Sequence, residues 1–123
     1  MTSDAAAPRV FIVEDEFMLV MLMEELLPTL GYEVAGTAAS VDEALAHLAS
    51  LPFDLAVVDV NLAGTESFPV ADALRERGIP FLFTTGYGQQ GLPPRFADAP
   101  VLAKPFRRHD IEAALTRLQA GTG

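Results

Sequence analysis

The chain has 123 residues, half of them hydrophobic, and its seventeen acidic residues outnumber eight Lys and Arg to give a formal net charge of −9. This length allows one compact core and excludes two ordinary domains, and the negative charge argues against a nucleic-acid partner, because phosphate backbones are bound by Lys and Arg. The chain contains no cysteine, which excludes disulfides and thiolate-ligated metals.

Five short apolar runs are typical of strands that are buried on both faces of a sheet. They lie at residues 10–13, 33–35, 55–58, 81–83 and 101–103, and the second is the weakest. Helical patterns alternate with them at residues 17–30, 41–51, 68–77 and 110–118. Ser40-Val41-Asp42-Glu43 is a capping-box pattern, and Gly31 and Gly78 stand where helix C-caps place glycine.

Short connections between these elements predict right-handed strand–helix–strand units. The expected fold class is α/β, a single doubly wound domain whose five-stranded parallel sheet carries helices on both faces. Residues 88–100 depart from this pattern, because two glycines and three prolines leave little room for a fourth helix. A loop or a single turn is expected there.

Polar residues that can carry chemistry follow directly after four of the predicted strands. They are Glu14 and Asp15, Asp59, Thr84 and Thr85, and Lys104. In open parallel sheets, ligand chemistry collects at the carboxyl ends of the strands, so these side chains are expected to meet. Three carboxylates brought together repel one another unless a cation joins them, and Mg²⁺ prefers such hard oxygen ligands. The sequence therefore predicts a magnesium site.

Asp59 is the candidate nucleophile of this site. An aspartate can attack phosphorus in line to form an acyl phosphate, while a metal and a cationic side chain balance the phosphoryl oxygens. Lys104, the single lysine of the chain, supplies that cation. Thr85 can donate its hydroxyl to a phosphoryl oxygen as a switch element. The pattern favours phosphoryl transfer to Asp59.

Nearly the whole chain resembles the receiver domain of bacterial two-component response regulators. The matching motifs are the acidic pair Glu14-Asp15, Asp59, Thr85 and Lys104-Pro105-Phe106, in the family's order and near its spacing. The resemblance implies that Asp59 is the phosphoacceptor and that Glu14, Asp15 and Asp59 hold Mg²⁺. It adds the backbone carbonyl of Asn61 as a further metal ligand. It also implies a cis Lys104–Pro105 peptide bond, a conformation that proline tolerates.

Two features depart from the commonest receiver pattern. Val101 stands three residues before Lys104, where many receivers carry a Tyr or Phe that rotates inward on phosphorylation. Phe83-Thr84-Thr85-Gly86-Tyr87 resembles the Phe-Ala-Thr-Gly signature of an atypical subgroup, which is also known for a poorly formed fourth helix. The candidate output and switch residues that remain are Thr84, Tyr87 and Pro105.

The expected function is that of a stand-alone response regulator, with a receiver domain at residues 9–118 and flexible ends at 1–8 and 119–123. It accepts a phosphoryl group from a histidine kinase or histidine phosphotransfer protein, and acts by protein contact or as a phosphate sink or shuttle. Its only catalysis is of its own phosphorylation and dephosphorylation. The N-terminus lacks a secretion signal, and the longest apolar run, 17–23, is too short to span a bilayer. A cytoplasmic protein without membrane contact is expected.

Two alternatives remain open. A pseudo-receiver binds partners without phosphorylation, and its wild type and Asp59→Asn variant would bind those partners alike. A magnesium-dependent phosphatase or mutase also uses an aspartate nucleophile, but Asn61 stands where its second, acid–base aspartate is expected.

The segment 17–23 is apolar around nearly two full helical turns, although a surface helix of an α/β domain needs to bury only one stripe. By default, Met18, Met21 and Met23 fill the core. We nevertheless expect part of this surface to face a partner, either the helical bundle of a kinase or phosphotransfer protein or a second copy of the chain in a homodimer.

Overall fold

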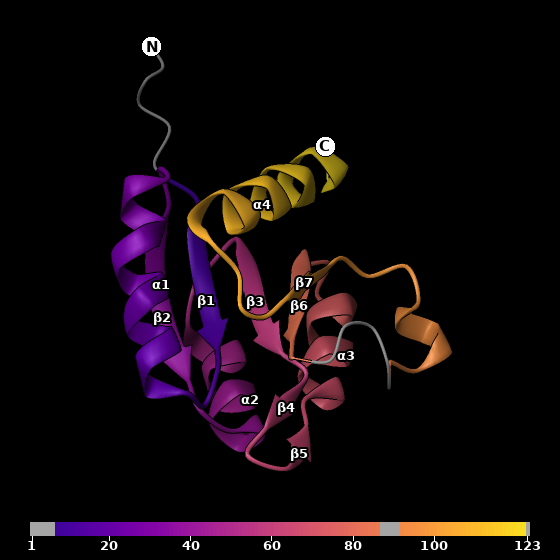
Figure 1. Ribbon diagram of the computed structural model, residues 1–123. Helices are drawn as coiled ribbons and strands as arrows, with labels where there is room; N and C mark the ends of the chain where they lie inside the picture. Colours follow the sequence, from indigo (N-terminus) through magenta and orange to yellow (C-terminus); the bar gives the residue numbers. More distant parts are fainter. Residues whose placement is uncertain (1–6, 87–91, 123) are drawn as a thin grey trace.

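The computed structural model describes residues 7–86 and 92–122 (Figure 1). Five parallel strands form one sheet in the order β2-β1-β3-β6-β7. The strands are β1 (Arg9–Val13), β2 (Glu33–Ala38), β3 (Leu55–Asp59), β6 (Phe81–Thr85) and β7 (Val101–Ala103). The chain moves outward from β1 to one edge and then, from β3, to the other, so its helices cover both faces. The doubly wound parallel fold predicted from the sequence is confirmed.

Two α-helices lie on each face of the sheet. They are α1 (Phe17–Thr29), α2 (Val41–Ser50), α3 (Phe68–Glu76) and α4 (Arg108–Thr122). Helices α1 and α4 pack on one face, and α2 and α3 pack on the other, so that each face has its own buried core (Figure 1). Among the described helices, none has the length and apolarity needed to cross a membrane.

The helix ends follow the predicted capping signals. Gly31 and Gly78 come directly after the ends of α1 and α3 with φ of 92° and 70°, a left-handed conformation that glycine adopts without strain. At the start of α2, Ser40 Oγ accepts a hydrogen bond from Glu43 N, and Glu43 Oε1 accepts one from Ala39 N. The Ser40 bond is the half of the expected capping box that forms, whereas the Glu43 carboxylate reaches Ala39 N, one residue before the N-cap.

Several boundaries differ from the prediction, most by one or two residues, and the larger differences lie at β2, after β3 and in α4. Strand β2 continues to Ala38, three residues further than expected, because it pairs along the whole of β1. Two short strands, β4 (Asn61–Leu62) and β5 (Thr65–Glu66), form a hairpin after β3 that no apolar pattern indicated. Helix α4 begins two residues before 110 and runs four residues past 118.

Hydrogen bonds at both ends of α4 account for its length. At the start, Asp110 Oδ2 accepts a hydrogen bond of 2.9 Å from Arg107 N. At the other end, Gln119 Nε2 donates to Tyr32 Oη over 3.0 Å, which holds the last turns against the domain. Part of the segment 119–123, expected to be a flexible end, is therefore helical.

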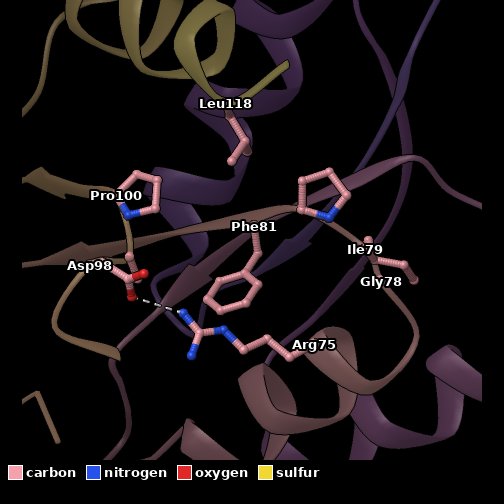
Figure 2. A pocket seen from close by; sticks show the side chains of 9 residues that line it. Arg75, Gly78, Ile79, Phe81, Asp98, Pro100 and Leu118 are labelled. Carbon is pink, nitrogen blue, oxygen red and sulfur yellow. Dashed lines mark hydrogen bonds and ion pairs between the residues drawn. The ribbon is translucent and has the colours of Figure 1, made fainter. Parts of the chain in front are cut away.

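No full helix lies between β6 and β7 in the described segment 92–100, as predicted. That segment contains one 3₁₀ turn, η2 (Pro94–Phe96), and the Phe96 side chain is fully buried. Arg75 of α3 lies beside Phe81 and pairs with Asp98 at 3.3 Å, next to a hollow of about 380 Å³ (Figure 2). The segment is thus fastened to α3 by an aromatic side chain, Phe96, and by two ion pairs, Arg75–Asp98 and Arg95–Asp72.

Candidate functional site

The carboxyl ends of β1, β3, β6 and β7 meet at one edge of the sheet and bring the predicted site residues together. Glu14 and Asp15 follow β1, Asp59 ends β3, Thr85 ends β6, and Lys104 follows β7. Four of these residues, all except Glu14, line an open hollow of about 600 Å³. Asn61, in strand β4, lines the same hollow.

Lys104 faces three carboxylates. Its Nζ lies 3.1 Å from Asp59 Oδ2, 3.1 Å from Glu14 Oε1 and 3.2 Å from Glu16 Oε1. The contacts with Asp59 and Glu16 are hydrogen bonds. The side chains of Glu14 and Asp59 are buried, whereas 64% of the Glu16 side chain is exposed. One ammonium therefore holds two buried carboxylates and one that reaches solvent.

Burial and neighbouring charges shift the ionisation of this cluster. Burial, reinforced by the Asp59 carboxylate, raises the pKa of Glu14 to about 7, against the lowering effect of the hydrogen bond from Glu16 N and of the ion pair with Lys104. Burial lowers the pKa of Lys104, but its bonds to Glu14 and Asp59 outweigh this effect and raise that pKa above its usual range. Lys104 is therefore a cation surrounded by more negative charge than it neutralises.

The strand ends that carry the site are tied by backbone hydrogen bonds. Lys104 N donates to Thr85 O over 2.8 Å, and Val60 N donates to Thr84 O over 3.0 Å. The Lys104–Pro105 peptide bond is cis, as the resemblance implied. The main chain thus fixes the strand ends that carry Asp59 and Lys104 relative to each other.

Glu14, Asp15 and Asp59 form the acidic part of the site. Each offers one carboxylate oxygen, and the three oxygens lie within 4.8 Å of one another. Glu14 Oε1 is buried and accepts no hydrogen bond of normal geometry from the described residues, despite its ion pair with Lys104. One ammonium balances only part of the charge of these carboxylates, and hard oxygen ligands with excess negative charge are suited to a divalent cation such as Mg²⁺. The residues present therefore fit the magnesium site that the sequence predicts.

The remaining candidate residues lie apart from this cluster or outside the described residues. Thr84 is fully buried on β6 and, being one position before Thr85, points to the opposite face of the sheet. Its Oγ1 has no hydrogen-bond partner among the described residues. Val101, at the start of β7, packs against the core on the α2/α3 face. Tyr87 falls within 87–91, outside the residues that the structure describes.

Two residues that contact the site were not singled out from the sequence. Glu16 pairs with Lys104 through its side chain, and its N donates to Glu14 Oε2 over 3.1 Å. Ser67 is fully buried, and its Oγ donates to Asp59 O over 2.6 Å. The sequence signal for Glu16 was its place as the third acid of an acidic run. The signal for Ser67 was its place directly before a predicted helix.

Comparison with known proteins gives consistent matches along the chain. The response regulator receiver domain family matches residues 10–116. The transcriptional regulatory protein PdtaR of Mycobacterium tuberculosis is 35% identical over 127 residues, which cover 95% of this chain and 62% of PdtaR. The phyllosphere-induced regulator PhyR of Methylorubrum extorquens is 32% identical, over 90% of this chain and 43% of PhyR. The chain thus spans less than two thirds of the length of these relatives.

Solved structures agree with the sequence matches. The solution structure of SdrG from Sphingomonas melonis Fr1 superposes with a TM-score of 0.82 at 41% identity, covering 94% of this chain and 98% of SdrG. The BeF3-activated conformation of SdrG from Pseudomonas melonis Fr1 gives a TM-score of 0.80 at 42% identity, over 93% of this chain and 98% of that one. The family match extends over most of the chain. This chain therefore belongs to the response regulator receiver domains of two-component systems.

Proposed function

We propose that Asp59 accepts a phosphoryl group from the phosphohistidine of a histidine kinase or histidine phosphotransfer protein. The observation that carries this proposal is the placement of Lys104 Nζ 3.1 Å from Asp59 Oδ2, next to the carboxylates of Glu14 and Asp15. A buried aspartate with a cation beside it and further acids around it suits a nucleophile that receives a negatively charged group.

In the transfer step, a carboxylate oxygen of Asp59 attacks the phosphorus of the donor in line with the bond to the imidazole nitrogen. The new P–O bond forms as the P–N bond breaks, and the electron pair of the broken bond stays on the imidazole. The product is an acyl phosphate on Asp59. Its later hydrolysis returns the free carboxylate and inorganic phosphate, so the chain catalyses only its own phosphorylation and dephosphorylation.

Each neighbouring group has a role in this reaction. Glu14, Asp15, Asp59 and the backbone carbonyl of Asn61 would hold Mg²⁺, which would supply positive charge for the phosphoryl oxygens. Lys104 pairs with a phosphoryl oxygen. Thr85 lines the same hollow and donates its hydroxyl to the new group, which is the step that couples phosphorylation to a change of conformation.

The output of this receiver follows the atypical Phe-Ala-Thr-Gly pattern. Val101 supplies no aromatic switch, and the described part of the β6–β7 connection contains only the short turn η2. We therefore expect a response that begins at Thr85 to involve Thr84, Tyr87 and Pro105. It is read by protein contact, or the chain acts only as a phosphate sink.

The donor docks on the exposed start of α1. Phe17 and Met18 are 72% and 76% exposed, and the neighbouring, mainly apolar hollow is lined by Met18, Leu19, Leu22 and Pro105, with Glu16 at its edge. Lys104 lines both this hollow and the acceptor site. A helical bundle that presents its phosphohistidine to Asp59 therefore covers the apolar start of α1 at the same time.

Phosphorylation by a small donor tests the proposal without knowledge of the kinase. Wild type, Asp59→Asn and the matched surface variant Asp42→Asn are incubated with Mg²⁺ and acetyl phosphate, and intact mass is recorded. We expect one base-labile phosphoryl adduct on wild type and on Asp42→Asn, none on Asp59→Asn, and none when EDTA removes the metal.

Two other outcomes contradict the proposal. An adduct on Asp59→Asn would place the acceptor elsewhere. A wild type that takes no adduct from acetyl phosphate, and binds BeF3⁻ no better than Asp59→Asn does, would identify an unphosphorylated binding module.

A further inference from the structure

Lys104 is shared by three carboxylates that differ in how easily they can leave it. Glu14 and Asp59 are buried, so a loss of the ammonium would leave each of them as an unpaired buried charge. Glu16 is 64% exposed, and water can replace its bond to Lys104. Of the three partners, Glu16 is the one that can be released at small cost.

Glu16 also occupies an unusual place in the helix that it begins. It is the N-cap residue of α1, a position that favours Ser, Thr, Asp or Asn, and its side chain makes no capping hydrogen bond. Its carboxylate is instead directed to Lys104, 88 residues away in the sequence. The side chain thus forgoes local helix stabilisation for a contact with the acceptor site.

Phosphorylation changes the charge that Lys104 has to balance. The single negative charge of Asp59 becomes the charge of about two on a phosphoryl group, beside an ammonium already bound to Glu16. The Glu16 carboxylate takes up one of the three contacts of the ammonium, and its negative charge repels the incoming group.

We propose that Glu16 is a positioning residue that competes with the phosphoryl group for Lys104 and thereby weakens the phosphorylated state. This inference rests on the proposed phosphorylation of Asp59. In the unphosphorylated protein Glu16 binds the Lys104 ammonium together with Glu14 and Asp59, and on phosphorylation it gives up the ammonium and turns to solvent. The cluster of carboxylates suited to the metal comprises Glu14, Asp15 and Asp59, without Glu16, so its role is toward Lys104 rather than toward Mg²⁺.

The test uses BeF3⁻, a tetrahedral analogue of the phosphoryl group, in the presence of saturating Mg²⁺. Wild type, Glu16→Gln and Glu25→Gln are titrated with beryllium in excess fluoride, and binding is followed through amide chemical shifts. Glu25→Gln is the matched control, since it removes the same charge from an exposed residue further along α1. We expect Glu16→Gln to bind BeF3⁻ about two- to five-fold more tightly than wild type, and Glu25→Gln to bind like wild type.

Three results would overturn the inference, and they can be told apart. Equal affinities in Glu16→Gln and Glu25→Gln would show that Glu16 acts at most through general charge. A loss of Mg²⁺ affinity of about ten-fold or more in Glu16→Gln, measured without beryllium, would make Glu16 a metal ligand. No BeF3⁻ binding by wild type would overturn the proposed function itself, whereas the first two results leave that function standing.

Discussion

The two faces of the sheet are covered in different ways. On the α1/α4 face, helices of 13 and 15 residues pack over a largely aliphatic core. On the other face, α2 and α3 have 10 and 9 residues, and the third element is only the turn η2. The core beneath them is built around phenylalanines. Where helical cover is short, large aromatic side chains fill the space that a longer helix would occupy.

Phe96 is the centre of this aromatic cover. Its ring lies 5.8 Å from that of Phe68 and 5.4 Å from that of Phe83, centroid to centroid. The guanidinium groups of Arg75 and Arg95 lie 4.8 and 4.7 Å from its centroid. One buried side chain from a three-residue turn therefore contacts α3 and β6 at once. A segment rich in glycine and proline can supply such a side chain without forming a helix.

Replacing Phe96 by alanine is the strongest way to break this arrangement. The substitution removes a fully buried aromatic side chain, and we expect it to lower the free energy of unfolding by about 3–5 kcal/mol. Urea unfolding measures this loss. Amide hydrogen exchange should also accelerate in β6, because η2 would no longer cover that strand.

Leu115→Ala supplies the matched control on the opposite face. Leu115 is also fully buried, and its truncation should cost about 2–5 kcal/mol. Because α4 continues for about two turns on either side of Leu115, β6 should keep its slow exchange relative to the rest of the variant. If Phe96→Ala cost less than about 1 kcal/mol, the role of η2 as a cover would be wrong.

Sequence patterns predicted the long elements and the centre of the site for a physical reason. Buried strands are continuous apolar runs, and parallel strands bring the residues that follow them to one edge, so Glu14, Asp59 and Lys104 could be placed together. The hairpin β4–β5 was missed because two-residue strands leave no periodicity. The pairing of Glu16 with Lys104 was missed because it depends on how a rotatable side chain is placed in the folded protein.

Thr84 tests whether the well-covered core on the α1/α4 face also has hydrogen-bond partners for its buried polar groups. Its buried hydroxyl has no hydrogen-bond partner among the described residues. Thr84→Val keeps the shape of the side chain and removes the unpaired group, so we expect the free energy of unfolding to rise by about 1 kcal/mol. Thermal unfolding would detect the increase. A decrease would mean that the hydroxyl has a partner that this conformation does not show.

Arg75 tests how much the charged contacts around Phe96 add to the stability of the α2/α3 face. Its guanidinium stacks on Phe96, pairs with Asp98 and donates to Arg95 O. Arg75→Met keeps the length of the side chain and removes these charged contacts, and we expect a loss of about 0.5–1 kcal/mol in unfolding free energy, since the group is partly exposed. Urea unfolding measures it, with Arg117→Met on the exposed side of α4 as the control. An equal change in both variants would assign no special role to the stacked guanidinium.

Substitution of Met18 should have the smallest effect on stability. It also separates the packing of the core from the docking of a partner protein. Its side chain is 76% exposed at the start of α1, so Met18→Lys should change the free energy of unfolding by less than about 0.5 kcal/mol. Phosphorylation by acetyl phosphate should also stay at the wild-type rate, since the small donor needs no docking surface.

Transfer from a phosphorylated phosphotransfer protein or kinase that serves the wild type should slow in Met18→Lys, because a charge in the apolar hollow opposes burial of the donor's helices. Glu24→Lys, further along the same helix, adds positive charge outside that hollow and should leave both rates unchanged. If Met18→Lys slowed both donors equally, the substitution would be acting on the acceptor site itself; if it slowed neither, the donor would dock elsewhere.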